Sequence, residues 1–388
     1  MIEADQFLGA AAARGIGFYT GVPCSFLTPL INRTASSRTL AYVGAASEGE
    51  AVAIAAGAWL GGQGTAVLCQ NSGLGNAVNP LTSLNTPFRI PTLLVVTWRG
   101  QPGLKDEPQH ALMGRITQDL LRIIEVPHRP FPSDPAGIGP ALDEAGAAMG
   151  RGVPFALVME KGSVQDDALD EPARTPLLPG TRTDRCEGGP RPARVEVLER
   201  LLALVPGRAA VVATTGKTGR ELFTLQDREQ HLYQVGSMGC ASGMGLGVAL
   251  ATRRRTVVLD GDGAALMKLG SLATIGAYQP CGLLHVLLDN GVHDSTGGQA
   301  TVSPVVDFAG VALACGYRRA FVCDTVPGFE ASLLAALDEV GPVLLHVRIR
   351  PGSVAKLGRP TIAPHEVAQR FRRFLAQPAR VAELAASV

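Results

Sequence analysis

Short apolar runs recur along the chain and are separated by stretches rich in alanine and glycine. The runs are continuous rather than strictly alternating, which is typical of parallel strands covered on both faces. In the first half the predicted strands are 17–20, 40–43, 65–69, 91–97 and 155–159. Residues 49–60 are mostly small and predict a helix that can pack closely against its neighbours. The first half is therefore predicted to be an α/β domain.

The second half repeats the same alternation. Its predicted strands are 209–213, 232–235, 256–259, 283–288 and 343–348, and a helix over 365–375 closes it. Between the halves, 166–192 is rich in proline, glycine, aspartate and arginine, a composition typical of a linker. The predicted fold class is α/β, with two doubly wound parallel-sheet domains. We place them at 1–165 and 196–388, joined by a linker at 166–195.

Composition and charge narrow the class of protein. The 388 residues carry a net charge of +1, and 46% of them are hydrophobic while only 18% are charged. This balance excludes extensive disorder and argues against a nucleic-acid partner, which usually requires a basic excess. The chain contains no run of about 18 apolar residues, so no membrane span is predicted.

The seven cysteines are scattered and lack the spacing of a metal site. We therefore expect reduced thiols, as in cytosolic proteins. The beginning of the sequence is acidic and predicted to be helical, unlike a signal peptide. These features predict a cytoplasmic location.

The strongest chemical motif lies in the second half. One predicted strand leads into Gly261, Asp262 and Gly263, and the next ends just before Asn290. Because neighbouring parallel strands end at the same edge of a sheet, Asp262 and Asn290 are expected to converge. A carboxylate and an amide oxygen suit Mg²⁺ shared with substrate phosphates, and the glycines let backbone amides approach a phosphate. The motif predicts a site for a metal and a phosphate group.

A Gly-Asp-Gly followed at this distance by Asn resembles the signature of thiamine-diphosphate enzymes. In that family the Asp and Asn side chains and a carbonyl shortly after the Asn hold Mg²⁺, which binds the diphosphate. The resemblance implies thiamine diphosphate and Mg²⁺ as cofactors. It implies Asp262, Asn290 and the carbonyl of Val292 as metal ligands, with Gly261 and Gly263 beside the cofactor.

Two further loops of the second half resemble cofactor loops of the same family. The residues implied to bind the diphosphate are Thr215, Gly216, Lys217 and Thr218. In the other loop the carbonyl of Gly236 is implied to accept a hydrogen bond from the aminopyrimidine. Met238 is implied to wedge beneath the cofactor; its alternative role is that of a core methionine.

Thiamine chemistry also needs a carboxylate that hydrogen-bonds the pyrimidine ring at N1′, at the start of a helix in the first domain. The sequence offers Glu48 and Glu50. In the family pattern this Glu precedes a Gly by nine positions, as Glu48 precedes Gly57. The resemblance therefore implies that Glu48 is catalytic. Glu50 is interpreted as an acid at a helix N-terminus, where anions are favourable.

Two polar loops follow strands in the first half. One contains Asn71 and Asn76, which are implied to bind the cofactor. The other contains Arg99, Lys105 and His110, two cations and a histidine that would suit a doubly anionic small molecule. The alternative for Arg99 and Lys105 is a solvated loop without a role in binding.

These segments together resemble the phosphonopyruvate decarboxylase family of thiamine-diphosphate-dependent 2-oxo acid decarboxylases. The resembling segments are TGVPCSFLTPL, SEGEAVAIAAG, QNSGLGNAVNPLTSL, WRGQPGLKDEPQH, TTGKTGRELF, VGSMGCASGMGLGVAL, the block from GDG to GGQ, and LGRPT. Two positions depart from many relatives, which carry Asp in place of Cys24 and His in place of Cys240. Cys24 becomes a candidate for substrate contact, and its use as a nucleophile is a weaker alternative.

The resemblance implies non-oxidative decarboxylation of 3-phosphonopyruvate to phosphonoacetaldehyde and CO₂, in phosphonate biosynthesis. His110 and His293 are candidates for relaying protons, and Ser295 and Thr296 are further candidates for binding the substrate. The alternatives are another anionic 2-oxo acid such as sulfopyruvate, addition of the carbanion to an acceptor, and a cofactor-binding subunit that needs a partner chain.

In this family the first, pyrimidine-binding domain of one subunit faces the second, diphosphate-binding domain of another. The resemblance therefore implies self-association into a dimer or a dimer of dimers, with complete sites only at subunit interfaces.

Overall fold

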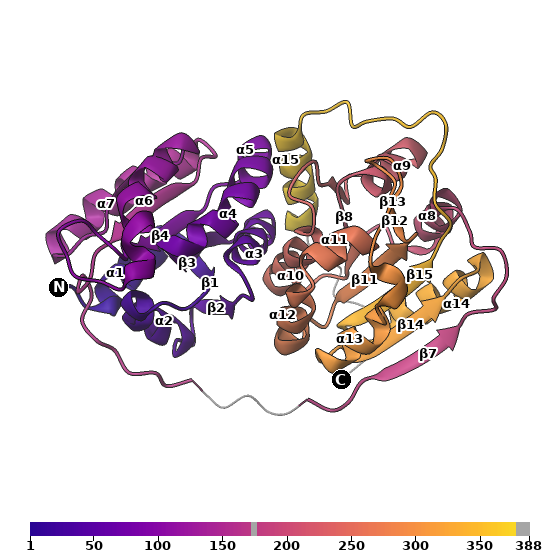
Figure 1. Ribbon diagram of the computed structural model, residues 1–388, viewed down its shortest axis with the longest axis horizontal. Helices are drawn as coiled ribbons and strands as arrows, with labels where there is room; N and C mark the ends of the chain where they lie inside the picture. Colours follow the sequence, from indigo (N-terminus) through magenta and orange to yellow (C-terminus); the bar gives the residue numbers. More distant parts are fainter. Residues whose placement is uncertain (172–176, 378–388) are drawn as a thin grey trace.

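The computed structural model describes residues 1–171 and 177–377, which form two α/β lobes (Figure 1). The first lobe holds a parallel sheet with the strand order β2-β1-β3-β4-β6-β5. Its strands are β1 (Ile16–Gly21), β2 (Ala41–Gly44), β3 (Gly64–Gln70), β4 (Leu93–Thr97), β5 (His128–Pro130) and β6 (Phe155–Met159).

Helices cover both faces of this sheet. One face packs on α1 (Ala4–Ala12), α2 (Thr28–Ala35) and α7 (Pro135–Gly150). The other packs on α3 (Glu48–Leu60), α4 (Leu74–Pro80) and α6 (Ala111–Ile123). Shorter helical segments are η1 (Ser25–Leu27), η2 (Asn71–Gly73), η3 (Leu81–Asn85), α5 (Thr86–Phe88) and η4 (Pro108–His110). Double coverage explains why the strands are continuous apolar runs.

The second lobe holds a larger parallel sheet with the order β7-β14-β15-β11-β10-β8-β9. Its strands are β7 (Thr181–Arg185), β8 (Ala210–Ala213), β9 (His231–Tyr233), β10 (Thr256–Gly261), β11 (Leu283–Asp289), β14 (Arg319–Cys323) and β15 (Val343–Arg348). A small antiparallel pair, β12 (Val292–His293) and β13 (Gln299–Ala300), follows β11. The central strands β10 and β11 carry the metal motif at their carboxyl ends.

This sheet is also covered on both faces. One layer contains α8 (Arg194–Leu204), α9 (Lys217–Leu225), α14 (Val326–Asp338) and α15 (Pro364–Ala376). The other contains α10 (Ala241–Thr252), α11 (Asp262–Met267), α12 (Gly270–Tyr278) and α13 (Phe308–Ala314), with η5 (Ser303–Val305) between β13 and α13. Within the described residues, no helix combines the length and the hydropathy needed to span a bilayer.

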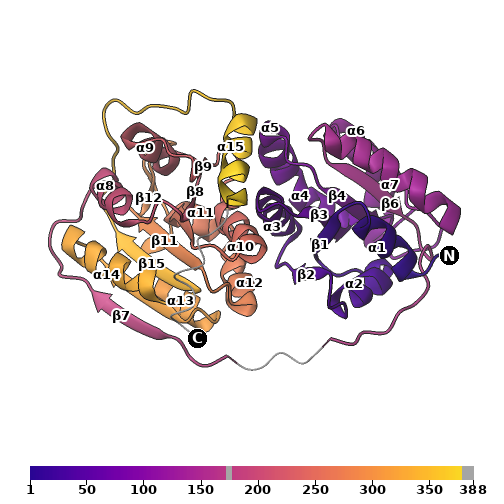
Figure 2. The same ribbon diagram turned by 180° about the vertical axis from the view of Figure 1, so that it is seen from behind.

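The two lobes contact each other mainly through α3 and α10, which lie side by side (Figure 2). A Cβ atom on Gly57 would lie 2.0 Å from the carbonyl oxygen of Met244. A Cβ atom on Gly247 would lie 2.1 Å from the carbonyl oxygen of Ile54. Only glycine allows the backbones to approach this closely. The predicted close packing of the small-residue helix is therefore confirmed, and it takes place at the contact between the lobes.

Every strand predicted from the sequence is present, and the predicted fold class is confirmed. The predicted linker at 166–195 needs one correction, because β7 lies inside it and pairs in parallel with β14. The sequence of β7, TRTDR, has no apolar run because it forms an exposed edge of the sheet, where charged side chains are usual. The domain boundaries themselves stay a prediction.

Candidate active site

The predicted metal ligands lie at one edge of the second sheet. Gly261 at the end of β10 is in register with Leu288 of β11, so Asp262 and Asn290 follow neighbouring strand ends. Asp262 is buried, and its Oδ2 accepts a hydrogen bond from the Thr301 hydroxyl at 2.5 Å. Burial raises the pKa of Asp262. No lysine or arginine among the described residues forms an ion pair with this carboxylate, so it is a buried acid suited to a cation.

The side-chain amide of Asn290 is fixed at both ends. Its Oδ1 accepts a hydrogen bond from the Val292 amide at 3.1 Å, and its Nδ2 donates to Asp294 Oδ2 at 2.7 Å. In the described part of the chain no group of three or more histidine, cysteine or acidic side chains could hold a metal. A cation at Asp262 and Asn290 would therefore need oxygens from the backbone and from a bound phosphate.

The loop after β8 forms a cradle at the start of α9. Gly216 has φ +94°, a conformation that favours glycine, and caps the N-terminus of the helix. Lys217 and Thr218 occupy the first turn, whose backbone amides are available to an anion. Thr214 is buried and its hydroxyl has no hydrogen-bond partner. This unpartnered hydroxyl fits a phosphate ligand. Thr214 was not among the predicted ligands, although it is the first residue of the segment TTGKTGRELF. The predicted ligand Thr215 instead donates its hydroxyl to the Val235 carbonyl at 2.9 Å.

Three residues from separate loops meet beside the metal motif. A Cβ atom on Gly263 would lie 2.7 Å from Cε1 of His293 and 3.3 Å from Cε of Met238. Met238 is only half-buried, which favours the predicted wedge over a core methionine. The close approach explains why position 263 needs glycine.

In the first lobe, Glu48 is the first residue of α3 and is buried. Its Oε2 accepts a hydrogen bond from Asn76 Nδ2 at 2.9 Å. A Cβ atom on Gly73 would lie 2.0 Å from its Oε1. Glu50 serves the local helix instead, because its Oε2 accepts a hydrogen bond from the Ala46 amide at 2.6 Å. The two acids thus have different hydrogen-bond partners, and the catalytic role of Glu48 stays a prediction.

The two halves of the site meet within one chain. The hydroxyls of Ser237 and Ser83 are 2.7 Å apart, which joins the Met238 loop to η3 of the first lobe. A Cβ atom on Gly49, next to Glu48, would lie 2.8 Å from Nζ of Lys268 in the second lobe. Loops from both lobes therefore lie in contact within one chain; that complete sites form at subunit interfaces stays a prediction.

Family models match both lobes. "Thiamine pyrophosphate enzyme, N-terminal TPP binding domain" matches residues 3–121, and the C-terminal TPP binding domain of the same enzymes matches residues 214–347. The chain belongs to the thiamine pyrophosphate enzymes.

Curated relatives extend the match over nearly the whole chain. Phosphonopyruvate decarboxylase of Streptomyces hygroscopicus is 51% identical over 97% of this chain and 95% of its own. The enzyme of the same name from Streptomyces viridochromogenes is 50% identical over 97% and 96%. Sulfopyruvate decarboxylase of Methanosarcina acetivorans is 28% identical over 93% and 94%. Among solved structures, benzoylformate decarboxylase from Polynucleobacter necessarius shares the fold with a TM-score of 0.69 and 13% identity, covering 91% of this chain and 100% of that one.

The residues of this thiamine pyrophosphate enzyme fit its cofactor. The cradle at Gly216 offers helix amides and the unpartnered Thr214 hydroxyl to a diphosphate. The buried Asp262 carboxylate lacks a cation among the described residues. Glu48 precedes Gly49, which lies against Lys268 at the contact between the lobes. These features suit an anionic ligand bound through a divalent cation.

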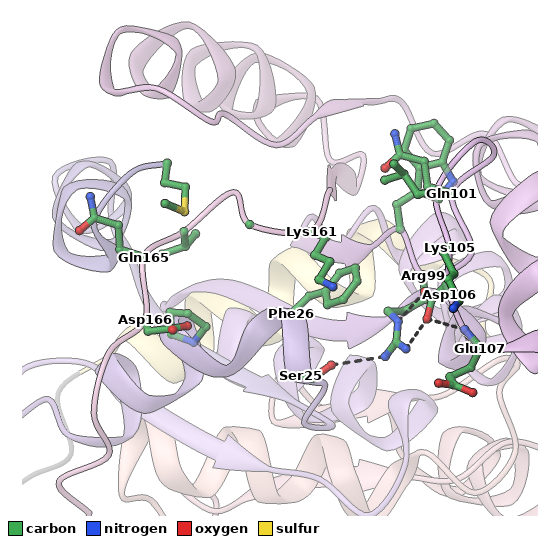
Figure 3. A pocket seen from close by; sticks show the side chains of 16 residues that line it. Ser25, Phe26, Arg99, Gln101, Lys105, Asp106, Glu107, Lys161, Gln165 and Asp166 are labelled. Carbon is green, nitrogen blue, oxygen red and sulfur yellow. Dashed lines mark hydrogen bonds and ion pairs between the residues drawn. The ribbon is translucent and has the colours of Figure 1, made fainter.

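The predicted substrate loop of the thiamine pyrophosphate enzyme borders a cavity of about 920 Å³ (Figure 3). Arg99 is largely engaged there, because its Nε and Nη2 donate to the two oxygens of Asp106 at 2.8 and 2.5 Å. The guanidinium lowers the pKa of Asp106. The remaining Nη1 donates to the Ser25 hydroxyl at 3.3 Å. Lys105 and Lys161 also line the cavity; Lys161, which follows β6, was not among the predicted residues.

Three other predicted residues do not line this cavity. Cys24 is buried and donates its thiol to Gln70 Oε1 at 3.2 Å. His110 is buried with Nδ1 unpartnered. Asn71 is fully buried and donates to the carbonyl of Arg99 at 2.8 Å, so it fastens the substrate loop. This geometry favours a structural role for Asn71 over the predicted contact with the cofactor.

The remaining predicted substrate residues lie in the turn between β12 and β13. The Ser295 hydroxyl is 3.1 Å from the position of a Cβ atom on Gly216, so it borders the cradle. Thr296 donates its hydroxyl to Gln299 Oε1 at 2.9 Å. Ser295 is thus brought to the diphosphate loop, whereas Thr296 stabilises its own turn.

Proposed function

We propose that the chain is a carboxy-lyase that uses thiamine diphosphate and Mg²⁺ to decarboxylate 3-phosphonopyruvate to phosphonoacetaldehyde and CO₂. The observation that carries the proposal is the contact between the lobes at two places: Gly49, next to Glu48, lies against Lys268, and Ser83 bonds Ser237, next to Met238. Two curated phosphonopyruvate decarboxylases are 51% and 50% identical to this chain over nearly their full length, which supports the choice of substrate.

Each part of the proposed site would bind a different part of the cofactor. Asp262, Asn290 and the carbonyl of Val292 would hold Mg²⁺, while the Gly216 cradle would hold the diphosphate. Glu48 would keep a hydrogen bond at the pyrimidine N1′ atom, which its burial makes stronger than in water. When bound, thiamine diphosphate supplies an electron sink that accepts the bonding electrons as CO₂ leaves.

The cavity beside the substrate loop offers two cations to the proposed substrate. The ammonium groups of Lys105 and Lys161 line it together with the carboxylates of Glu107 and Asp166, and neither lysine forms an ion pair with a carboxylate in the described part of the chain. A phosphonate with up to two negative charges would be attracted by both, whereas Arg99 is already neutralised by Asp106. His110 and His293 are the proposed proton carriers, and Cys24 and Ser295 stay candidates for further contacts.

A decarboxylase assay on the purified chain tests the proposal. With thiamine diphosphate and Mg²⁺ present, CO₂ should be released from phosphonopyruvate in preference to sulfopyruvate and pyruvate. A preference for sulfopyruvate would favour the alternative that the 28% identical relative suggests. Product NMR with an added aldehyde separates decarboxylation from carbon–carbon bond formation, and no turnover of phosphonopyruvate would refute the proposed substrate. We place the reaction in phosphonate biosynthesis.

We also propose that the chain self-associates. The outer face of α6 supports this, because Leu112 and Ile123 are 58% and 77% exposed and Ile116 lies between them on the same face. An exposed aliphatic row on a helix is typical of an interaction surface. Light scattering should give a mass above that of one chain, and Ile116→Asp should lower it; a monomeric wild type would contradict the proposal.

A further inference from the structure

A buried cluster of charged side chains lies behind the proposed metal site. It consists of Asp294, Arg194 and Glu221, and we call it the Asp294 cluster. Arg194 Nη2 donates to Asp294 Oδ2 at 2.7 Å, and Arg194 Nη1 lies 3.6 Å from Glu221 Oε1. The side chains of Arg194, Asp294 and Glu221 are 5%, 13% and 1% exposed. The cluster joins the starts of α8 and α9 to the turn after β12.

Burying three charges needs an explanation. Removing charged groups from water costs several kcal/mol for each ion, so a buried ion pair is weak evidence for stability. A function that requires one fixed geometry is a better explanation. The contacts of Asp294 indicate which geometry this is.

Asp294 holds the amide of Asn290. The same Oδ2 atom that binds Arg194 accepts a hydrogen bond from Asn290 Nδ2 at 2.7 Å. The other end of that amide, Oδ1, accepts from the Val292 amide at 3.1 Å and keeps a second lone pair. Only the oxygen of an amide can bind a hard cation. If the side-chain amide of Asn290 were rotated by 180°, the cation would lose this oxygen as a ligand.

The cluster also fastens the C-terminal segment that passes α8 and α9 on its way from β15 to α15 (Figures 1 and 2). The Gly352 amide is 3.2 Å from both carboxylate oxygens of Asp294. The Val354 amide donates to Glu221 Oε1 at 3.1 Å. Between them, Ser353 accepts a hydrogen bond from Lys217 Nζ at 3.2 Å. The segment therefore ties the proposed metal ligand to the diphosphate cradle.

We propose that Asp294 is a positioning residue of the metal site: it fixes the Asn290 amide so that Oδ1 is presented to the cation, and Arg194 with Glu221 holds Asp294 in place. This inference rests on the proposed function, which supplies the cation. Groups that orient a metal ligand from behind typically change metal affinity by about 10- to 100-fold when they are removed.

Binding of Mn²⁺ in the presence of thiamine diphosphate tests this without a catalytic assay. Free Mn²⁺ is measured by its electron paramagnetic resonance signal. Asp294→Ala should weaken Mn²⁺ binding by about 10- to 100-fold. Asp294→Asn should rescue most of the affinity, because its carbonyl oxygen can still accept from Asn290. Thr224→Ala is the matched control: it removes the 2.9 Å bond from the Gly358 amide to Thr224, loosening the same segment without touching Asn290. Its Mn²⁺ affinity should equal that of the wild type.

The outcomes separate the two proposals. Wild-type chain that binds no Mn²⁺ with thiamine diphosphate would overturn the proposed function and this inference with it. Normal wild-type binding with an unchanged affinity in folded Asp294→Ala would overturn only the positioning role. A loss in Thr224→Ala equal to that in Asp294→Ala would also overturn it, since general loosening would then suffice. If Asp294→Ala does not fold, Arg194→Lys takes its place, with a loss of about threefold to tenfold expected and no loss overturning the role.

Discussion

Replacing Glu48 by glutamine tests the centre of the proposed site. The substitution keeps the size of the side chain and leaves a carbonyl oxygen to accept from Asn76, which donates to Glu48 at 2.9 Å. It removes the negative charge from a buried position packed against Gly73. We therefore expect a folded chain that still binds Mg²⁺ and thiamine diphosphate.

The expected loss follows from the hydrogen bond that Glu48 would make to the pyrimidine. A hydrogen bond to a charged group contributes about 1.5–3 kcal/mol. Because about 1.4 kcal/mol corresponds to a tenfold change, removing the charge should slow exchange of the cofactor's C2 proton by roughly 10- to 150-fold. The assay is acid-quenched deuterium exchange followed by NMR, with cofactor binding measured separately by calorimetry.

Glu50→Gln is the matched control, because Glu50 is also a buried acid in the first turn of α3. The side-chain carbonyl oxygen of the glutamine can still accept a hydrogen bond from the Ala46 amide, so the rate of C2-proton exchange should stay within about threefold of the wild type. The reasoning is refuted if Glu48→Gln exchanges at the wild-type rate while binding cofactor, or if Glu50→Gln slows exchange equally.

Three further predictions concern the substrate cavity, the contact between the lobes and a buried histidine. Lys105→Ala combined with Lys161→Ala should raise KM for phosphonopyruvate with little change in kcat, and added salt should then raise KM less than in the wild type; equal salt dependence would contradict the role of these lysines. Gly57→Ala, whose Cβ would lie 2.0 Å from a carbonyl oxygen, should destabilise the chain by about 1–3 kcal/mol. In contrast, Gly146→Ala in α7, with nothing within 4 Å, should stabilise it by about 0.5–1 kcal/mol, both measured by urea unfolding. Burial lowers the pKa of His231 to about 4, so the unfolded chain binds more protons between this value and about 6.5. Stability should therefore fall by about 3 kcal/mol as pH drops through that window, and His231→Gln should abolish this part of the loss; an unchanged pH profile would refute it.

The sequence alone determined most strands of both sheets, though not β5, β7 and β14, and the ends of β10 and β11 that carry Asp262 and Asn290. It did so because strands covered on both faces must be apolar along their whole length. The family resemblance also predicts that Glu48 rather than Glu50 is catalytic, through the distance of nine positions from Glu48 to Gly57. Apolar runs and residue spacings of this kind lie within short stretches of sequence, so they can be recognised without the tertiary structure.

Tertiary structure decided what depends on contacts between distant segments. Strand β7 was hidden because an exposed edge strand needs no apolar run, and Lys161 because only the order of the sheet brings it to Lys105. The neutralisation of Arg99 by Asp106 and the bond from Asn290 to Asp294 depend on side-chain geometry that spacing does not encode. Periodicity reveals which face of an element is buried, whereas hydrogen-bond partners are chosen by the folded chain.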